Sequence, residues 1–537
     1  MSYTQTWTRT PTPAPTWIRR RLPSFPLLAL LLSSLFSQCT QSKAVFAHFM
    51  VANTKNYTLT TWKTDMLLAQ ASSIDAFALN AGYGMPHTAR ALRDAFAAAE
   101  ELNFKLLFSL DYSGDGHWPK DRVVDVLTEY TPHAAYFRHS DGRALVTTFE
   151  GFQAAGDWAD IKRTVGNATA SANNSTTLAG EGNGNENGTL SGGGGGGCCF
   201  LIPDWTSVGP RRAAGVEAVD GLMSWDAWPT GAQAMNTTED EEWMEVLDGR
   251  PYIMPVSPWF YTNLKRFNKN WVWRGDDLWY ERWEQVLELN PAYVEILTWN
   301  DYGESHYIGP LVDGATGILG QAGAPFDYVS GMPHDGWRAT LPYLIAMYKA
   351  GDSEGEREGA VEIQEEVLSV WYRLSHADSC GDGKTTGNSE SQGQTLLEPG
   401  EVLEDKVFYS ALLEASAEVR VSIGGDNRSV EWTDVPSSGR GVYHGSVDMG
   451  QRTGEVVVTL QRDGAFLAQM EGKSIEKTCP GNLTNWNAWV GNATGVKQNR
   501  PSGSGHGGES GGVSAVQAWI GGVALGLAFA ILFSTST

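Results

Sequence analysis

The chain has 537 residues, with 39 Lys and Arg against 62 Asp and Glu, which gives a net charge of −23. This excess of negative charge argues against nucleic acid or an anionic surface as partner, because phosphate binding needs clustered cations. Apolar residues make up 42% of the chain, enough for a large core, and the 21 tryptophans fit either core packing or stacking on sugar rings.

The N-terminal segment, residues 1–43, is expected to be a signal peptide with a long preceding region. Arg19, Arg20 and Arg21 precede the apolar run Leu27–Leu35, and small and polar residues follow it. This is the pattern of a secretory signal. An uncleaved anchor is the alternative, but the apolar run is short for a bilayer span.

Residues 44–355 are predicted to form a (β/α)8 TIM-type barrel, because eight β-branched and aromatic runs alternate with amphipathic stretches. A doubly wound open sheet would usually show a glycine-rich turn after its first strand, and the sequence from His48 to Val51 is not one. The predicted strands are Ala44–Val51, Ile74–Asn80, Phe104–Asp111, Ala144–Glu150, Cys199–Trp205, Gly221–Trp228, Tyr252–Trp259 and Tyr293–Asn300. The predicted helices are Leu59–Ser72, His87–Asn103, Lys120–Tyr130, Trp158–Val165, Arg211–Ala218, Asp240–Leu247, Leu278–Leu289 and about Trp337–Ala350.

An insertion, residues 167–197, interrupts the barrel pattern. It consists mostly of Asn, Gly, Ser and Thr, ends in six glycines and cannot bury a core. We expect a disordered, glycosylated segment on the helix-to-strand side of the barrel, away from the catalytic face.

Sequons and cysteines agree with an exported protein. Cys39 would leave with the signal peptide, and the four remaining cysteines allow three pairings, among which the sequence does not choose. Their spacing matches no metal site. They are Cys198, Cys199, Cys380 and Cys479, and the sequons are Asn56, Asn167, Asn173, Asn174, Asn187, Asn236, Asn427, Asn482 and Asn492.

The C-terminal region, residues 356–478, is predicted to be a β-sandwich that supports the barrel or contacts glycan. Residues 479–513 read as a polar linker, and the apolar tail 514–537 reads as a GPI signal, with a plain membrane helix as the alternative. The predicted strands of the sandwich are Val367–Tyr372, Val407–Ser410, Ala417–Ile423, Gly441–Val447 and Glu455–Arg462.

Carboxylates and aromatic residues stand at the ends of the predicted barrel strands, where the active site of such a barrel lies. No strand end carries the turn of a serine nucleophile. A carboxyl group that protonates a leaving oxygen, a second that activates water or attacks the anomeric carbon, and aromatic faces that hold sugars together favour glycoside hydrolysis. The densest polar segment is Trp299–His306, in which Asp301 and Glu304 are three residues apart and can share one cleft.

The run from Trp299 to Pro310, WNDYGESHYIGP, resembles the hallmark of glycoside hydrolase family 71, the fungal α-1,3-glucanases or mutanases. Four further segments match the family's strands, and the resemblance extends from Val45 to about Ile475. These segments are Val45–Val51 with Tyr57 and Thr58, Ile74–Asn80, Phe108–Asp111 and Pro203–Trp205. The insertion and the terminal tail depart from the family pattern.

The resemblance implies endo-hydrolysis of α-1,3-glucosidic bonds with inversion, and it makes Asp301 and Glu304 the catalytic pair. We assign Glu304 as general acid and Asp301 as general base. No cofactor or metal is implied, the partner is the polysaccharide, contact with a membrane is only through the tail, and we expect a monomer at the cell surface or wall. The expected substrate-binding residues are His48, Asn80, Asp111, Asp204, Trp205, Asp226, Trp228, Trp259, Trp299 and His306.

Three other interpretations stay open at this stage. A transglycosylase on the same glucan could use the same cleft, although inversion disfavours it. A catalytically inactive, wall-anchored glucan-binding protein would have no need of the acid. A Ca²⁺ or Mg²⁺ site built from strand-end aspartates lacks an EF-hand loop or an acidic cluster.

Overall fold

Eight parallel strands form one sheet in the N-terminal half of the chain. The computed structural model describes residues 43–114, 116–177, 198–351, 357 and 360–496. The strands follow one another in the order β5-β4-β3-β2-β1-β10-β7-β6, with parallel pairing throughout. They are β1 (Ala44–Met50), β2 (Ala76–Gly82), β3 (Lys105–Asp111), β4 (Ala144–Phe149), β5 (Cys199–Leu201), β6 (Leu222–Met223), β7 (Tyr252–Val256) and β10 (Tyr293–Ile296).

Asp204 closes this sheet into a barrel. Its backbone forms parallel bridges to Phe149 on one side and to Met223 on the other, so that the two short strands β5 and β6 are joined. The predicted barrel is therefore confirmed, the eight predicted strands are present, and the open doubly wound alternative is wrong.

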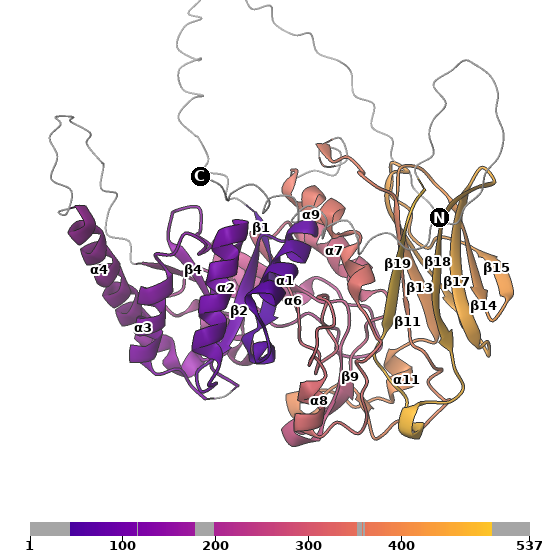
Figure 1. Cartoon of the computed structure of the whole chain (residues 1–537), viewed down its shortest axis with the longest axis horizontal. Coiled ribbons are helices and arrows are strands. Elements are labelled where there is room, and N and C mark those ends of the chain that lie inside the picture. Colours follow the sequence, from indigo (N-terminus) through magenta and orange to yellow (C-terminus); the bar gives the residue numbers. More distant parts are fainter. Residues whose placement is uncertain (1–42, 115, 178–197, 352–356, 358–359, 497–537) are drawn as a thin grey trace, which may run out of the picture. The chain divides into compact units, whose positions relative to one another are not determined.

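Helices between the strands cover the barrel (Figure 1). The first begins at Leu59 because the side chain of Thr58 caps it, accepting the N–H of Thr61, whose hydroxyl in turn faces the Thr58 N–H. The helices are α1 (Leu59–Ala71), α2 (Thr88–Leu102), α3 (Lys120–Tyr130), α4 (Trp158–Thr177), α5 (Pro210–Ala214), α6 (Thr238–Leu247), α7 (Leu278–Leu289), α8 (Gly317–Ala322) and α9 (Leu341–Lys349).

The expected disorder of residues 167–197 is wrong for the first part of that range. Helix α4 continues to Thr177, and the hydroxyls of Thr169 and Ser171 donate to carbonyls one turn earlier in the same helix. Alanines and short polar side chains tolerate a helix that tertiary contacts have already started. Residues 178–197 lie outside the described residues.

Two antiparallel sheets, each of four strands, follow the barrel. One has the order β16-β13-β11-β19 and the other β15-β14-β17-β18, and the two bury a shared apolar core. This confirms the predicted sandwich. The strands are β11 (Val367–Tyr372), β13 (Lys406–Leu413), β14 (Glu418–Ile423), β15 (Asp426–Val430), β16 (Gly441–Asp448), β17 (Gly454–Arg462), β18 (Ala465–Ile475) and β19 (Trp489–Thr494). Of these, β15, β18 and β19 were not predicted, and β19 lies inside the range expected to be a linker.

A hairpin in the loop after β7 forms a third, smaller sheet. Its strands β8 (Tyr261–Leu264) and β9 (Lys269–Val272) are antiparallel, and β12 (Thr386–Gly387) pairs with β9. The sequence analysis did not predict this hairpin. It matters for function because it extends from the C-terminal end of a barrel strand.

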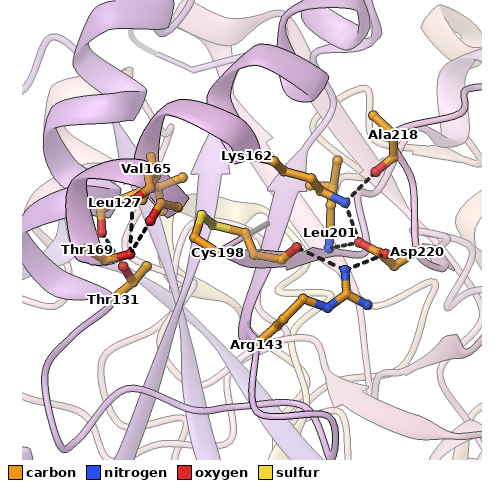
Figure 2. Close-up of a disulfide and its surroundings, with 12 residues drawn as sticks. Leu127, Thr131, Arg143, Lys162, Val165, Thr169, Cys198, Leu201, Ala218 and Asp220 are labelled. Carbon is orange, nitrogen blue, oxygen red and sulfur yellow. Dashed lines mark hydrogen bonds and ion pairs between the residues drawn. A yellow bond between two sulfur atoms is a disulfide. The ribbon is translucent and has the colours of Figure 1, made fainter. Parts of the chain in front are cut away.

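Both disulfides left open by the sequence are defined by the structure. Cys380 pairs with Cys479, 99 residues away, and Cys198 pairs with its neighbour Cys199. Figure 2 shows the second at the start of β5, beside an ion cluster in which Arg143 and Lys162 both contact the carboxylate of Asp220.

Candidate active site

The loop that follows β10 carries the two predicted catalytic carboxylates and folds back on itself. The N–H of Asp301 donates to the Thr298 hydroxyl at 2.8 Å, and the N–H of Glu304 donates to Asp301 Oδ1 at 3.1 Å. The N–H of Thr298 donates to the His306 carbonyl at 2.8 Å, which closes the loop. Local hydrogen bonds thus bring Asp301, Glu304 and His306 together.

A left-handed residue makes this curl possible. Ser305, between Glu304 and His306, is fully buried and has φ +58°, a conformation that costs a non-glycine residue roughly 1 kcal/mol or more. Gly309 ends the curl, and a Cβ there would lie 2.5 Å from the Trp299 carbonyl oxygen, so no larger residue fits without a shift. The segment from Trp299 to Pro310 is therefore constrained by its backbone conformation as well as by the chemistry of its side chains.

Lys269, on β9 of the hairpin, contacts Glu304. Its ammonium forms an ion pair with Glu304 Oε1, while His306 Nε2 lies 3.2 Å from Glu304 Oε2 and 3.9 Å from Asp301 Oδ2. One oxygen of each carboxyl and one ring nitrogen all lie within 4.8 Å of one another. Two acids, an imidazole and an ammonium therefore share one site.

The pKa values of the two carboxyl groups are shifted in opposite directions. Burial alone would raise the pKa of Glu304, but the charge of Lys269 and the contact with His306 outweigh it and hold that pKa at about 2. Burial, followed by the negative charge of Glu304, raises the pKa of Asp301. Glu304 is thus the carboxylate and Asp301 the group that retains a proton to higher pH.

An aromatic wall stands beside this pair. The ring of His306 stacks on Phe260 at 5.7 Å between centroids and lies 5.3 Å from Trp228. Trp228 stacks on Trp273 at 5.2 Å and donates its indole N–H to the Trp259 carbonyl. The predicted residues Trp228 and His306 therefore lie together at the site.

His48 lies on the inner side of the barrel mouth. Its Nδ1 is 2.7 Å from Glu295 Oε1, both side chains are buried, and its ring packs edge to face against Trp225 at 4.8 Å. Phe149 packs on Trp225 from β4 at 4.7 Å. Trp225 thus contacts residues from two strands at the top of the barrel.

The other predicted acids have separate environments. Asp111, at the end of β3, accepts the N–H groups of Ser113 and Gly114, and its charge contributes to raising the pKa of Lys269. Asp204 is buried, accepts from the Thr206 hydroxyl at 2.6 Å, and burial raises its pKa well above the usual range.

Asp226 is half-buried and its interactions face α6. Burial, followed by the charge of Glu239, raises the pKa of Asp226 to about 7, and Trp243 donates a hydrogen bond to it. It is therefore held by the neighbouring helix, away from the interactions of Asp301 and Glu304.

Three predicted tryptophans are packed in the core instead of lining the cleft. Trp205 and Trp299 are fully buried, and their rings contact Phe152 and Phe77 respectively. Trp259 donates its indole N–H to the Trp486 carbonyl at 2.9 Å, and an added Cβ at Gly275 would lie 2.3 Å from its ring. Their positions at strand ends made them candidates, but their side chains face away from solvent. Asn80 is buried on β2.

A divalent cation could in principle be considered at the Asp301, Glu304 and His306 cluster, since two carboxylates and an imidazole are common ligands. The Lys269 ammonium already contacts Glu304, however, and a cation would meet that positive charge. We assign no metal to these residues.

Lys269 and Trp225 were not among the residues predicted from the sequence. Lys269 belongs to a hairpin that is distant in sequence from the strand end. The alternating residues Trp271 and Trp273, which follow the turn at Asn268, were the signal that could have revealed this hairpin. Trp225 lies two residues beyond β6, where Trp228 was the tryptophan predicted to bind substrate.

Comparison with known proteins points to one family. The model of glycosyl hydrolase family 71 matches residues 41–502. Mutanase Pc12g07500 of Penicillium rubens is 32% identical over 87% of this chain and 93% of its own length. Glucan endo-1,3-alpha-glucosidase agn1 of Schizosaccharomyces pombe is 33% identical over 86% of this chain and 98% of its own length. An ascus wall endo-1,3-alpha-glucanase of the same yeast is 29% identical over 57% of this chain.

Proposed function

Because the chain belongs to glycosyl hydrolase family 71, we propose that it is a glycoside hydrolase that cleaves the α-1,3-glucosidic bonds of fungal cell-wall α-1,3-glucan. Two relatives that match it over most of their length bear the names mutanase and glucan endo-1,3-alpha-glucosidase. The observation that carries the proposal is the pairing of Asp301 with Glu304 at the mouth of the barrel, beside an aromatic wall.

The opposite pKa shifts divide the roles between the two acids. Asp301, whose pKa is raised, gives its proton to the glycosidic oxygen as the bond to the anomeric carbon breaks. Glu304, kept ionised by Lys269, takes a proton from the water that attacks that carbon. This assignment reverses the one expected from the sequence.

Inversion remains a prediction. An inverting pair usually stands roughly 6.5–9.5 Å apart to leave room for water, whereas one oxygen of Asp301 lies within 4.8 Å of one of Glu304. Proton NMR of the first-formed sugar decides the matter. A β-anomer from the α-linked polymer means inversion, and an α-anomer means retention.

The main experiment is reducing-sugar release from insoluble α-1,3-glucan. Protein ending at Val513 is compared with Asp301→Asn and Glu304→Gln. Activity in the parent and a loss of about 10²-fold or more in both variants supports the proposal. An active variant moves the role to Asp111, Asp204 or Asp226. An inactive parent that still binds the polymer is a glucan-binding protein, and longer products in place of shorter ones indicate a transglycosylase.

We further propose that the protein is exported and attached to the cell surface, as a monomer. The support is the sequence of residues 1–43 and 514–537, of which residues 1–42 and 514–537 lie outside the described residues. None of the helices in the described part of the chain is long and apolar enough to cross a membrane. Release of the protein from cells by phosphatidylinositol-specific phospholipase C tests the GPI anchor against a membrane helix.

A further inference from the structure

Trp225 differs from the other barrel tryptophans in its exposure. Among the described residues, Trp225 and Trp432 are half-exposed, whereas the remaining tryptophans are buried. Trp432 belongs to the sandwich, where its indole N–H donates to the Ala417 carbonyl. Among the barrel tryptophans that the structure describes, Trp225 is thus the one that is only half-buried.

Trp225 is held at the mouth from two sides. His48 of β1 packs against its ring with planes at 77°, and Phe149 of β4 packs against it at 65°. Edge-to-face contacts of this kind fix a ring's orientation and contribute about 0.5–1.5 kcal/mol each beyond the area they bury. His48 is in turn fixed by Glu295, so the support below the indole is itself rigid.

The backbone of Trp225 is positioned by a short relay. Its N–H donates to the Thr206 hydroxyl at 2.7 Å, and that hydroxyl donates to Asp204 Oδ1 at 2.6 Å. Asp204 also closes the barrel through its backbone bridges. The backbone of Trp225 is therefore attached, through Thr206, to the residue that closes the barrel.

The segment that carries Trp225 also reaches the catalytic loop. Trp228, three residues later, lies 5.3 Å from the ring of His306, which contacts Glu304. Trp225 therefore connects the inner side of the mouth, at His48 and Phe149, with the wall beside the carboxylates.

We infer that Trp225 is the stacking platform for a glucosyl ring of the substrate. A rigid, half-exposed indole presents a flat apolar face, which is complementary to the C–H face of a pyranose ring. Preorganisation reduces the entropy lost when the sugar binds. The inference rests on the proposed function, because it needs a sugar in this cleft.

The test compares Trp225→Tyr with Trp225→Leu in the truncated protein, with far-UV circular dichroism as a check on folding. A platform requires a π-face, so we expect Trp225→Tyr to keep kcat/KM on α-1,3-glucan within about fivefold, and Trp225→Leu to lose about 10–100-fold. Affinity for a soluble α-1,3-linked gluco-oligosaccharide, measured by calorimetry in the Asp301→Asn background, should fall in parallel. Trp432→Leu is the matched control and should change neither value.

Equal activity of the Tyr and Leu variants would mean that Trp225 only fills volume, and the inference would be overturned. Unchanged affinity in Trp225→Leu would do the same. An inactive parent would instead refute the proposed function, so the two failures are distinguishable. Should Trp225→Leu not fold, Trp225→Met replaces it, since methionine is flexible and also lacks a ring face.

Discussion

The two ends of the barrel differ in how their polar groups are paired. At the end where the strands begin, the carboxylate of Asp220 accepts from Arg143, from Lys162 and from the Leu201 N–H, so both oxygens have partners (Figure 2). At the end where the strands finish, several buried polar atoms have no hydrogen-bond partner among the described residues. They are His48 Nε2, Asn80 Oδ1, Asp204 Oδ2, Ser305 Oγ and His306 Nδ1.

This contrast separates stability from function. A buried polar group without a partner costs about 1–3 kcal/mol, and native proteins rarely accumulate such groups without a reason. A sugar carries hydroxyls that can donate and accept, so unpaired polar groups around the barrel mouth fit a role in binding a ligand. At the other end, the charge of Asp220 is paired within the protein.

The sharpest test of the contrast is to remove a carboxylate that we propose to be catalytic. We expect Glu304→Gln to lower kcat/KM on α-1,3-glucan by about 10²–10⁴-fold, because general acid and base catalysis contributes on that scale. Initial rates of reducing-sugar release measure it. Activity within tenfold of the parent would contradict the assignment of Glu304.

The next largest expected effect is a loss of stability at the end of the barrel where the strands begin. Asp220→Asn removes the carboxylate that Lys162 and Arg143 share, and Arg143 keeps Asp141, so the free energy of unfolding should fall by roughly 2 kcal/mol. Urea unfolding measures the change. The rate on glucan at low temperature should stay that of the parent, and a large loss of activity in a folded variant would break the division between the two ends.

A pH profile tests the charge of Lys269. Without its ammonium, the pKa of Glu304 should rise from about 2, because the largest effect that opposes burial is removed and the contact with His306 remains. Glu304 must be ionised to accept a proton, so the acidic limb of kcat/KM in Lys269→Met should move to higher pH. At pH 3 the variant should have lost about tenfold more activity than at pH 6.

Lys265→Met is the matched control for this change. Lys265 lies on the same hairpin and is exposed, and its substitution should leave the profile where it is. A limb that stays in place in Lys269→Met would show that Lys269 does not set the charge of Glu304.

The smallest expected effect is a gain in stability, opposite in sign to the loss expected for Asp220→Asn. Burial raises the folded-state pKa of Asp204, so its contribution to stability is present below the unfolded pKa and is lost as the pH rises. Asp204→Asn should therefore stabilise the protein at pH 7 by about 1 kcal/mol, with no gain at pH 3. Thermal unfolding at the two pH values measures it, and a destabilised variant at pH 7 would mean that Asp204 is charged and paired.

Much of the fold could be predicted from sequence, and the reasons are local. The barrel strands were identified because each is a short apolar run bounded by turns, and α3 and α7 match their predicted limits. The carboxylates Asp301 and Glu304 were found because they follow a strand directly. Strand β19 was missed because its pairing with β11 is a tertiary contact, which a run of Asn, Gly and Thr does not announce.

The environment of the site was less predictable than its residues. A position at a strand end does not determine which way the side chain points. Trp205 and Trp299 were therefore predicted to bind substrate although they face the core. The ion pair of Lys269 depends on a hairpin that returns to the mouth, and the proposed exchange of roles between the two acids rests on that ion pair.

The pairing of β9 with β12 links the barrel hairpin to the segment that leads into the sandwich, so the two parts should evolve together. The strand that carries Lys269 is hydrogen-bonded to residues 386–387, and the segment that begins at Cys380 is covalently held to Cys479. A recombination event that exchanged the sandwich for another module would also remove the neighbour of the hairpin and disturb the charge beside Glu304. Barrel and sandwich should therefore have been inherited together, and engineering by module exchange should begin beyond Gly495.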